Sequence, residues 1–156
     1  MAKHYLTPEG KKQLEEKLNH YRTVLRPEVV KEIGAAREYG DLRENSEYEA
    51  AKDRQALIEA EISEMEDILL NCEIIKKKDI DTETVSIGCS VTLFDDEYKE
   101  EVTYKILGST ESDPRNGIIS NVSPVGAALL GHKKGETVQV HMQAGTIKYK
   151  ILDIKM

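Results

Sequence analysis

The sequence predicts an α+β protein in which a long antiparallel helical hairpin precedes a small antiparallel β-sheet with one covering helix. Apolar residues repeat every three or four positions through residues 8–72, and an acidic turn near residue 40 interrupts the repeat. Beyond residue 80 the apolar period falls to two, which is typical of strands. We therefore expect a coiled-coil domain at residues 1–76 and a sheet domain at residues 77–156.

The first helix is expected to begin at Thr7-Pro8, because Thr can cap a helix and Pro loses no hydrogen bond at the first helical position. Its apolar stripe is narrow and of coiled-coil type. The stripe runs through Leu14, Leu18, Tyr21 and Leu25, and then through Val29, Ile33 and Ala36. Because Pro27 lacks an amide and crowds the preceding turn, we expect the helix to bend there.

The second helix carries a heptad seam without a break. The seam consists of Tyr48, Ala51, Gln55, Ile58, Ile62, Met65, Leu69 and Cys72. A lone helix with so thin a stripe is marginal in water, so the two helices are expected to bury their stripes against each other as an antiparallel pair.

Residues 76–83 are rich in charge and are expected to form a linker. The strands that follow are marked by alternating apolar residues: Val91 and Leu93; Val102, Tyr104 and Ile106; Val138, Val140 and Met142; Ile147, Tyr149 and Ile151. Ser123-Pro124 is expected to open the covering helix, from Val125 to Leu130, which Gly131 ends. The lysine run 76–78 is interpreted as a solvated linker or, alternatively, as a contact to nucleic acid or an acidic partner.

The composition excludes several classes of protein. With 33% charged residues and no long apolar run, the chain offers no membrane-spanning segment, and its N-terminus lacks the apolar core of a secretory signal, so we expect it in the cytoplasm. Cys72 and Cys89 are expected to be reduced packing residues, with a disulfide between them as the alternative. The net charge of −7 argues against a general binder of duplex DNA.

The turn between the two helices, residues 40–52, is the candidate functional site. Gly40 tolerates the positive φ that ends one helix, and Asn45 or Ser46 can accept hydrogen bonds from the first free amides of the next. The helices keep their seam up to this turn, as expected of a rod that presents its tip. The alternative is an ordinary solvated hairpin end.

The turn is unusually acidic. Asp41, Glu44 and Glu47 recur at three-residue spacing, and the apolar Leu42 lies between acids. Carboxylate oxygens suit Mg²⁺, but that ion needs further ligands, and two exposed carboxylates do not hold it alone. The pattern therefore predicts half of a metal site, completed inside a partner that supplies acids and phosphate.

No other group of residues in the sequence predicts a catalytic centre within the chain. The histidines at positions 4, 20, 132 and 141 show no metal-ligand spacing, and the segment 131–135 is too short for a phosphate-binding glycine loop. No serine or cysteine triad can be assigned.

Two motifs carry a resemblance to a known family. The segment Ala36–Lys52 resembles the signature of the bacterial Gre transcript-cleavage factors, of the GreA type. The segment Ser123–Gly131, followed by Gly135-Glu136, is similar to the motif in that family's C-terminal domain. The likeness extends over essentially the whole chain, including Thr7-Pro8 and Arg26-Pro27.

The resemblance implies an FKBP-like C-terminal domain that docks at the rim of the secondary channel of bacterial RNA polymerase, and a coiled coil that reaches through the channel. The polymerase is then the enzyme, and this protein is not a stand-alone nuclease. By this resemblance Asp41 and Glu44 match the two tip acids, which help to place a second Mg²⁺ so that a backtracked polymerase cleaves its own RNA. We also expect a monomer without sequence-specific DNA binding.

Further site residues are implied by the same resemblance. Arg37 and Lys52 match a small basic patch toward the nascent RNA 3′ end, although Lys replaces the commoner Arg at position 52 and loses bidentate phosphate contact. Ser123 and Pro124 are candidates for polymerase docking. Ser46 stands where Ala is common.

Two alternatives remain at this point. A channel-binding relative that inhibits polymerase would carry an altered tip, whereas Asp41 and Glu44 are intact here. A prolyl isomerase is suggested only by the FKBP-like fold, and fold does not give function. An isomerase pocket needs an aromatic lining, and residues 80–156 hold four aromatic residues, Phe94, Tyr98, Tyr104 and Tyr149, and no Trp.

Overall fold

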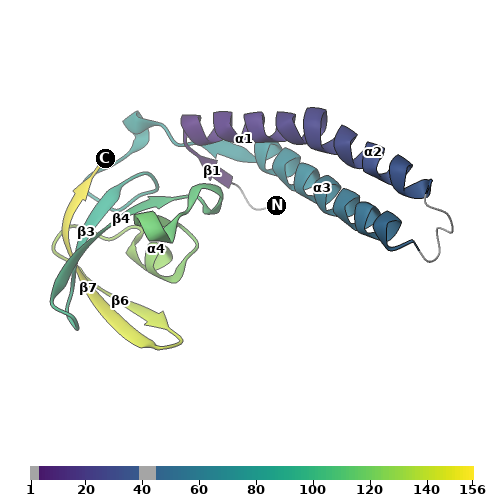
Figure 1. Ribbon diagram of the computed structural model, residues 1–156. Helices are drawn as coiled ribbons and strands as arrows, with labels where there is room; N and C mark the ends of the chain where they lie inside the picture. The colour runs from purple at the N-terminus through teal and green to yellow at the C-terminus, as the bar shows by residue number, and fades with distance from the viewer. Residues whose placement is uncertain (1–3, 39–44) are drawn as a thin grey trace. The chain divides into compact units, whose positions relative to one another are not determined.

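The computed structural model describes residues 4–38 and 45–156, apart from the side chain of Asp79 (Figure 1). Its contacts divide the chain into two units, Lys11–Asn71 and Met1–Gly10 with Cys72–Met156. The start of the chain thus groups with the C-terminal unit. The sequence-based boundary between residues 76 and 77 stays a prediction.

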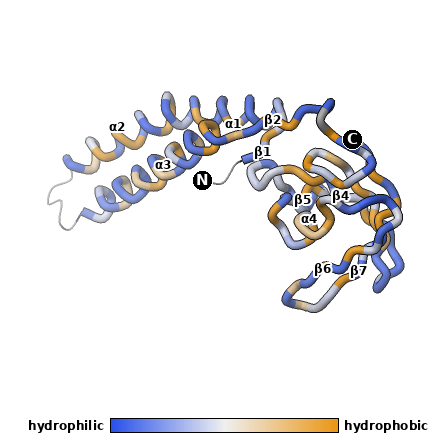
Figure 2. Tube along the Cα trace, turned by 180° about the vertical axis from the view of Figure 1, so that it is seen from behind, coloured by the Kyte–Doolittle hydropathy of each residue, from blue (hydrophilic) through white to orange (hydrophobic). Residues whose placement is uncertain are grey.

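The helical unit is the expected hairpin. Its first arm consists of α1 (Pro8–His20), a π-helical turn η1 (Tyr21–Leu25) and α2 (Arg26–Arg37), and its second arm is α3 (Ser46–Leu70). Figure 2 shows the alternation of hydrophobic and hydrophilic residues along these helices. Among the described helices, none is long and apolar enough to cross a membrane.

Ion pairs between the arms show that they run antiparallel. Arg22 pairs with Glu66 at 2.9 Å, and further along the arm Arg26 pairs with Glu59 at 2.7 Å. Beyond them lies the pair Glu32–Arg54. As the residue number rises along one arm, its partner's number falls along the other.

Most of the predicted stripe is buried in the seam between the arms. The buried residues are Leu14, Leu18, Val29, Ile33 and Ala36 on the first arm and Ala51, Ile58, Ile62, Met65 and Ile68 on the second. The end of the second stripe was wrongly predicted: α3 ends at Leu70, and Cys72 lies in a strand. Ile68 is buried in place of the half-buried Leu69.

The irregularity near Pro27 takes the form of a π turn. The N–H of Arg26 donates to the carbonyl of Tyr21, five residues back, and Pro27, which has no N–H to donate, follows directly in α2. The extra residue in this turn relieves the crowding that the proline ring causes in the turn before it.

The C-terminal unit contains a five-stranded sheet in the order β5-β4-β3-β7-β6. The strands are β3 (Ser90–Asp95), β4 (Glu100–Leu107), β5 (Ile118–Ser120), β6 (Thr137–Met142) and β7 (Gly145–Lys155). The prediction of an antiparallel sheet is correct for four strands and wrong for β5, which pairs in parallel with β4. Two short 3₁₀ turns, η3 (Ser109–Glu111) and η4 (Pro114–Asn116), carry the chain back to make that pairing.

A second, two-stranded sheet anchors the start of the chain. Strand β1 (His4–Leu6) pairs in parallel with β2 (Cys72–Ile74), and Leu6 is fully buried. The backbone N–H and the hydroxyl of Thr7 both donate to the Glu111 carboxylate, at 2.7 and 2.5 Å. Thr7 also accepts from the N–H of Gly10 at 3.0 Å, which caps α1 as expected.

The core of the C-terminal unit lies on one face of the five-stranded sheet, beneath α4 (Pro124–Leu129). Leu93, Ile106, Leu129 and Ile151 are fully buried there. Burial raises the pKa of Tyr149 to about 12, so this phenol stays neutral. Cys89 is fully buried in this core, as expected of a packing residue, and Cys72 is half-buried in β2.

Candidate functional site

The described residues that flank the acidic turn are held by Asn45. This residue is the N-cap of α3, and its side-chain oxygen accepts from the N–H of Tyr48 at 3.1 Å. Its side-chain amide donates to the carbonyl of Ala36, in the last turn of α2. Of the two predicted caps, Asn45 and Ser46, the structure thus selects Asn45, and the same side chain ties the two arms together.

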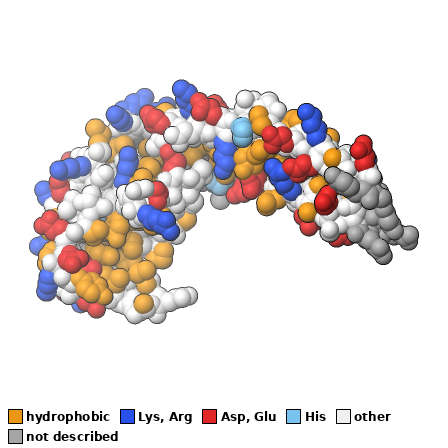
Figure 3. All heavy atoms as spheres, in the orientation of Figure 1, with side chains coloured by type: hydrophobic (Ala, Val, Ile, Leu, Met, Phe, Trp, Pro, Cys, Tyr) orange, Lys and Arg blue, Asp and Glu red, His pale blue; other side chains and the backbone are white. Residues whose placement is uncertain are grey.

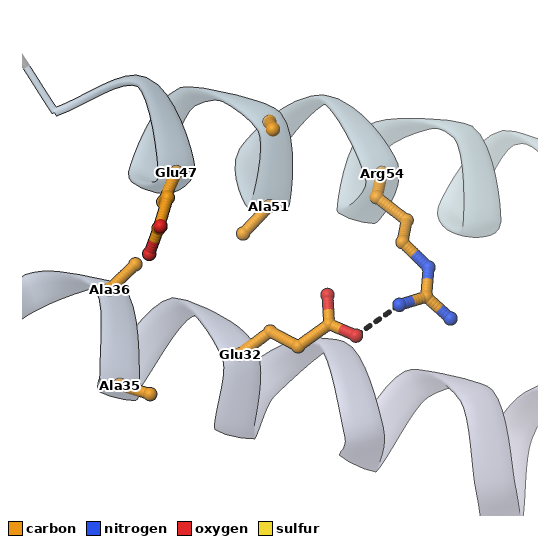
Figure 4. Close-up of a pocket in the computed structure, with 7 residues that line it drawn as sticks. Glu32, Ala35, Ala36, Glu47, Ala51 and Arg54 are labelled. Carbon is orange, nitrogen blue, oxygen red and sulfur yellow. Dashed lines mark hydrogen bonds and ion pairs between the residues drawn. The ribbon is translucent and has the colours of Figure 1, made fainter.

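Small side chains bring the arms close below the turn. Ala36 and Ala51 are buried where α2 and α3 meet, and Glu32 reaches across to Arg54 (Figure 4). They belong to a shallow hollow of about 390 Å³, lined by Glu32, Ala35, Ala36, Glu47, Ala50, Ala51 and Arg54. Its polar groups are solvated, and its one ion pair already joins the arms, so the hollow supports the end of the hairpin and has no catalytic geometry of its own.

Two basic residues of the predicted site flank the turn. Arg37, the last residue of α2, is exposed, and its guanidinium lies 6.0 Å from the centre of the Tyr48 ring. This cation–π contact orients the charge without neutralising it. Lys52, on the exposed face of α3, donates to the side-chain oxygen of Gln55 at 3.3 Å.

The two predicted tip acids, Asp41 and Glu44, lie outside the described residues. The next acid, Glu47, is described: it is exposed in the first turn of α3, where the helix dipole favours a negative charge. Within the described part of the chain, no three His, Cys, Asp or Glu side chains are grouped to hold a metal ion. The chemistry of two carboxylates suits Mg²⁺ only when other groups complete the coordination.

In the C-terminal unit, Ser123 and Pro124 open α4 as the sequence predicts. The Ser123 hydroxyl accepts from the N–H of Gly126 at 3.2 Å and donates to the carbonyl of Ser120 at 2.6 Å. Its hydrogen bonds are therefore used within the fold, whereas Pro124 is exposed. A role for either residue in partner binding stays a prediction.

Sequence reasoning missed Val122, which precedes this pair and is 72% exposed. The signal was present: Val122 is an apolar residue between the polar residues Asn121 and Ser123, in a turn where solubility favours another polar one. Figure 3 shows hydrophobic side chains gathered on the visible face of the C-terminal unit. Val125, Ala128 and Leu130 of the α4 region are partly buried against the core.

Comparison with known proteins decides the family. The family model described as "Transcription elongation factor, N-terminal" matches residues 4–74, and the model "Transcription elongation factor, GreA/GreB, C-term" matches residues 80–156. The chain belongs to the GreA/GreB family. The resemblance carried by the two sequence motifs is thereby confirmed.

Full-length relatives agree with this assignment. The transcription elongation factor GreA of Caldanaerobacter subterraneus is 53% identical over 96% of each chain, and GreA of Thermoanaerobacter pseudethanolicus is 52% identical over 96% of each. Among solved structures, GreA factor homolog 1 of Thermus thermophilus is 29% identical, with 99% of this chain and 100% of that chain covered and a TM-score of 0.46.

As a GreA/GreB protein, the chain is a transcription elongation factor of the transcript-cleavage class, with RNA polymerase as its partner. It acts on the polymerase's own cleavage reaction and is not a stand-alone enzyme, as the sequence motifs predicted.

Proposed function

We propose that this protein enters the secondary channel of bacterial RNA polymerase and presents Asp41 and Glu44 to the polymerase active site, where backtracked RNA is cleaved. The hairpin is the observation that carries the proposal. Its arms are joined by ion pairs along their length and by Asn45 immediately before α3, so the segment between them is carried on a stiff support. An acidic segment on such a support suits delivery into another protein's site.

The two carboxylates supply negative oxygens that are useful only within the complex. Mg²⁺ shared with the polymerase would supply charge stabilisation and a polarised water for hydrolysis of the phosphodiester. Asp41 and Glu44 would complete the ligand set and hold that water toward the scissile phosphate. Because two carboxylates bind Mg²⁺ weakly on their own, the free protein is expected to show no tight site.

Arg37 and Lys52 are proposed to contact the nascent RNA 3′ segment. Both are exposed on the turns of helix next to the acidic segment, one on each arm. The Tyr48 ring limits the directions in which Arg37 can point, which lowers the entropy lost when it meets a phosphate. Lys52 adds charge without bidentate geometry.

The C-terminal unit is proposed to dock on the polymerase through the surface at the start of α4. Pro124 is exposed there, and the adjacent Val122 exposes 72% of its surface. Exposed apolar side chains beside a rigid cap are a suitable anchor for a protein partner. Ser123 would act by fixing this turn, since its hydroxyl already bonds within the fold. The protein is proposed to work as a monomer in the bacterial cytoplasm, without reading DNA sequence.

A transcript-cleavage assay tests the proposal. Purified polymerase is halted, allowed to backtrack, and given the protein with Mg²⁺; labelled RNA is expected to shorten only when protein, polymerase and Mg²⁺ are all present. The inhibitory alternative predicts slower elongation and no shortening. A proline-isomerisation assay with the same protein is expected to show no activity, and clear activity would revive the isomerase alternative.

A further inference from the structure

The C-terminal unit contains a groove that the proposed function does not use. It lies between the start of α1, the segment after β2, and β4, and its volume is about 710 Å³. Ile75, Ile80 and Leu107 contribute its apolar lining. A groove of this size can hold one or two large side chains of a partner.

A glycine with positive φ allows the groove to have this shape. Gly88 has φ +101°, and a Cβ at that position would lie 2.9 Å from Cγ2 of Ile75 and 2.9 Å from Cδ1 of Ile80. Any side chain there would push these two residues apart. The apolar lining therefore depends on Gly88 for both its conformation and its space.

The groove is basic, although the chain as a whole carries a net charge of −7. Lys76, Lys77 and Lys105 all line it and are all exposed, while Glu9 is the single acid among the lining residues. Within the described part of the chain, none of these three lysines takes part in an ion pair. Lys105 lies opposite Ser90 in the sheet, and Lys155, which pairs with Asp153 at 3.7 Å, lies on the other side of Ser90.

We propose that this basic groove, defined by Lys76, Lys77, Lys105 and the apolar lining, docks an acidic polypeptide segment of RNA polymerase. The partner's apolar side chain would lie against Ile75 and Leu107, and its carboxylates would meet the lysines. The inference rests on the proposed function for the identity of the partner. None of the groove's lining residues belongs to α4 or the turn before it, so this contact is additional to the one proposed for Ser123 and Pro124.

The lining favours a polypeptide over RNA or DNA. Binding of single-stranded nucleic acid relies on aromatic side chains that stack on the bases, and no aromatic residue lines this groove. Aliphatic side chains with a rim of ammonium groups instead match an apolar residue flanked by Asp or Glu. Charges at the rim of an interface mainly raise the association rate, and salt screens them.

A charge-reversal variant tests the groove. Lys76→Glu, Lys77→Glu and Lys105→Glu are combined in one full-length protein, and the matched control combines Lys133→Glu, Lys148→Glu and Lys150→Glu, which change the charge equally outside the groove. Fluorescence anisotropy of labelled protein measures its binding to polymerase. The groove variant should bind about tenfold more weakly at low salt, as expected for three exposed ion pairs, and the control should stay within about twofold of wild type. Equal binding of the two variants would overturn the proposal.

Cleavage assays separate this inference from the proposed function. The groove variant should need more protein for half-maximal cleavage but reach the wild-type rate at saturation, because no groove residue belongs to the tip. Failure of the wild-type protein to stimulate cleavage would contradict the proposed function. The binding comparison would still test whether the groove docks on polymerase.

A crosslinking experiment identifies the occupant. A photoreactive amino acid replaces Lys77, and the complex with purified polymerase is irradiated and mapped by mass spectrometry. A crosslink to an acidic stretch of a polymerase subunit supports the proposal. A crosslink to RNA or DNA, to a basic stretch, or to nothing would overturn it.

Discussion

The side-chain amide of Asn45 donates to the carbonyl of Ala36, which joins the first residue before α3 to the last turn of α2. The other end of the same amide caps α3 by accepting from Tyr48. One side chain therefore bonds to a carbonyl in the last turn of one arm and to an N–H in the first turn of the other. Both proposed tip acids lie between Glu38 and Asn45 in the sequence, so this bond joins the two helix ends that flank them.

Replacing Asn45 should separate its two roles. Asn45→Ala removes both bonds and should lower the free energy of unfolding by about 1–2 kcal/mol. Asn45→Asp keeps the capping oxygen but loses the donor to Ala36, so its loss should be smaller. Urea unfolding followed by helical circular dichroism measures both losses. An unchanged free energy of unfolding in Asn45→Asp would mean that the bond to Ala36 contributes nothing.

Two glycine substitutions should change the free energy of unfolding in opposite directions. Gly34 lies in α2, and a Cβ added there meets nothing within 4 Å, so Gly34→Ala should stabilise the hairpin by about 0.5–1 kcal/mol. A Cβ on Gly126 would lie 2.1 Å from the carbonyl oxygen of Ser120. Gly126→Ala should therefore destabilise the C-terminal unit by about 2–3 kcal/mol. Thermal unfolding of each full-length variant checks the signs, and stabilisation by Gly126→Ala would refute the described packing of α4.

The ion pair between Arg26 and Glu59 should make hairpin stability depend on pH. The hydrogen bonds from Arg26 hold the pKa of the Glu59 carboxyl below its ordinary value of 4.5. The stabilisation is therefore present above the unfolded-state pKa and is lost as the pH falls through the lower folded-state pKa. The unfolding temperature of wild type should exceed that of Glu59→Gln at about pH 7, and the difference should shrink as the pH falls below 4.5. Both groups are exposed, so the effect is small. A difference that grows on acidification would contradict this assignment.

The Thr7–Glu111 contact should stabilise the start of the chain against the C-terminal unit. Glu111→Gln keeps the shape but loses the charge that accepts from the N–H and hydroxyl of Thr7, so we expect a loss of about 1 kcal/mol. Hydrogen exchange should show faster opening of β1 in this variant. Glu101→Gln, at an exposed position on β4, serves as the control and should leave β1 unchanged.

Regular periodicity explains which parts of the fold could be predicted from the sequence. The heptad stripe depends only on residues within one helix, so Ile58 and Ile62 could be placed in a seam before any partner was known. The same holds for the alternation at Val91 and Leu93. Three strands, β1, β2 and β5, have only three residues each, too few to show a period. The parallel pairing of β1 with β2 joins segments far apart in the sequence, and that of β4 with β5 spans a loop.

The candidate site could likewise be predicted only where its interactions are local in the sequence. Residue types and spacing identify Asn45 as a possible cap, because capping is a local interaction. Its second bond depends on a carbonyl nine residues earlier on another helix, which no local pattern specifies. The basic groove shows the same limit: the run at 76–78 is visible in the sequence, but its meeting with Lys105 and Leu107 depends on the tertiary fold.

Transcript cleavage by variants of the tip acids tests the central claim most directly. Halted, backtracked polymerase is given wild type, Asp41→Asn, Glu44→Gln or, as a control in the next turn, Glu47→Gln, and the rate of RNA shortening is measured at saturating protein. We predict that Asp41→Asn and Glu44→Gln abolish the stimulated shortening while binding to polymerase stays nearly intact, and that Glu47→Gln retains most of the activity. Wild-type cleavage rates for both Asp41→Asn and Glu44→Gln would contradict the account.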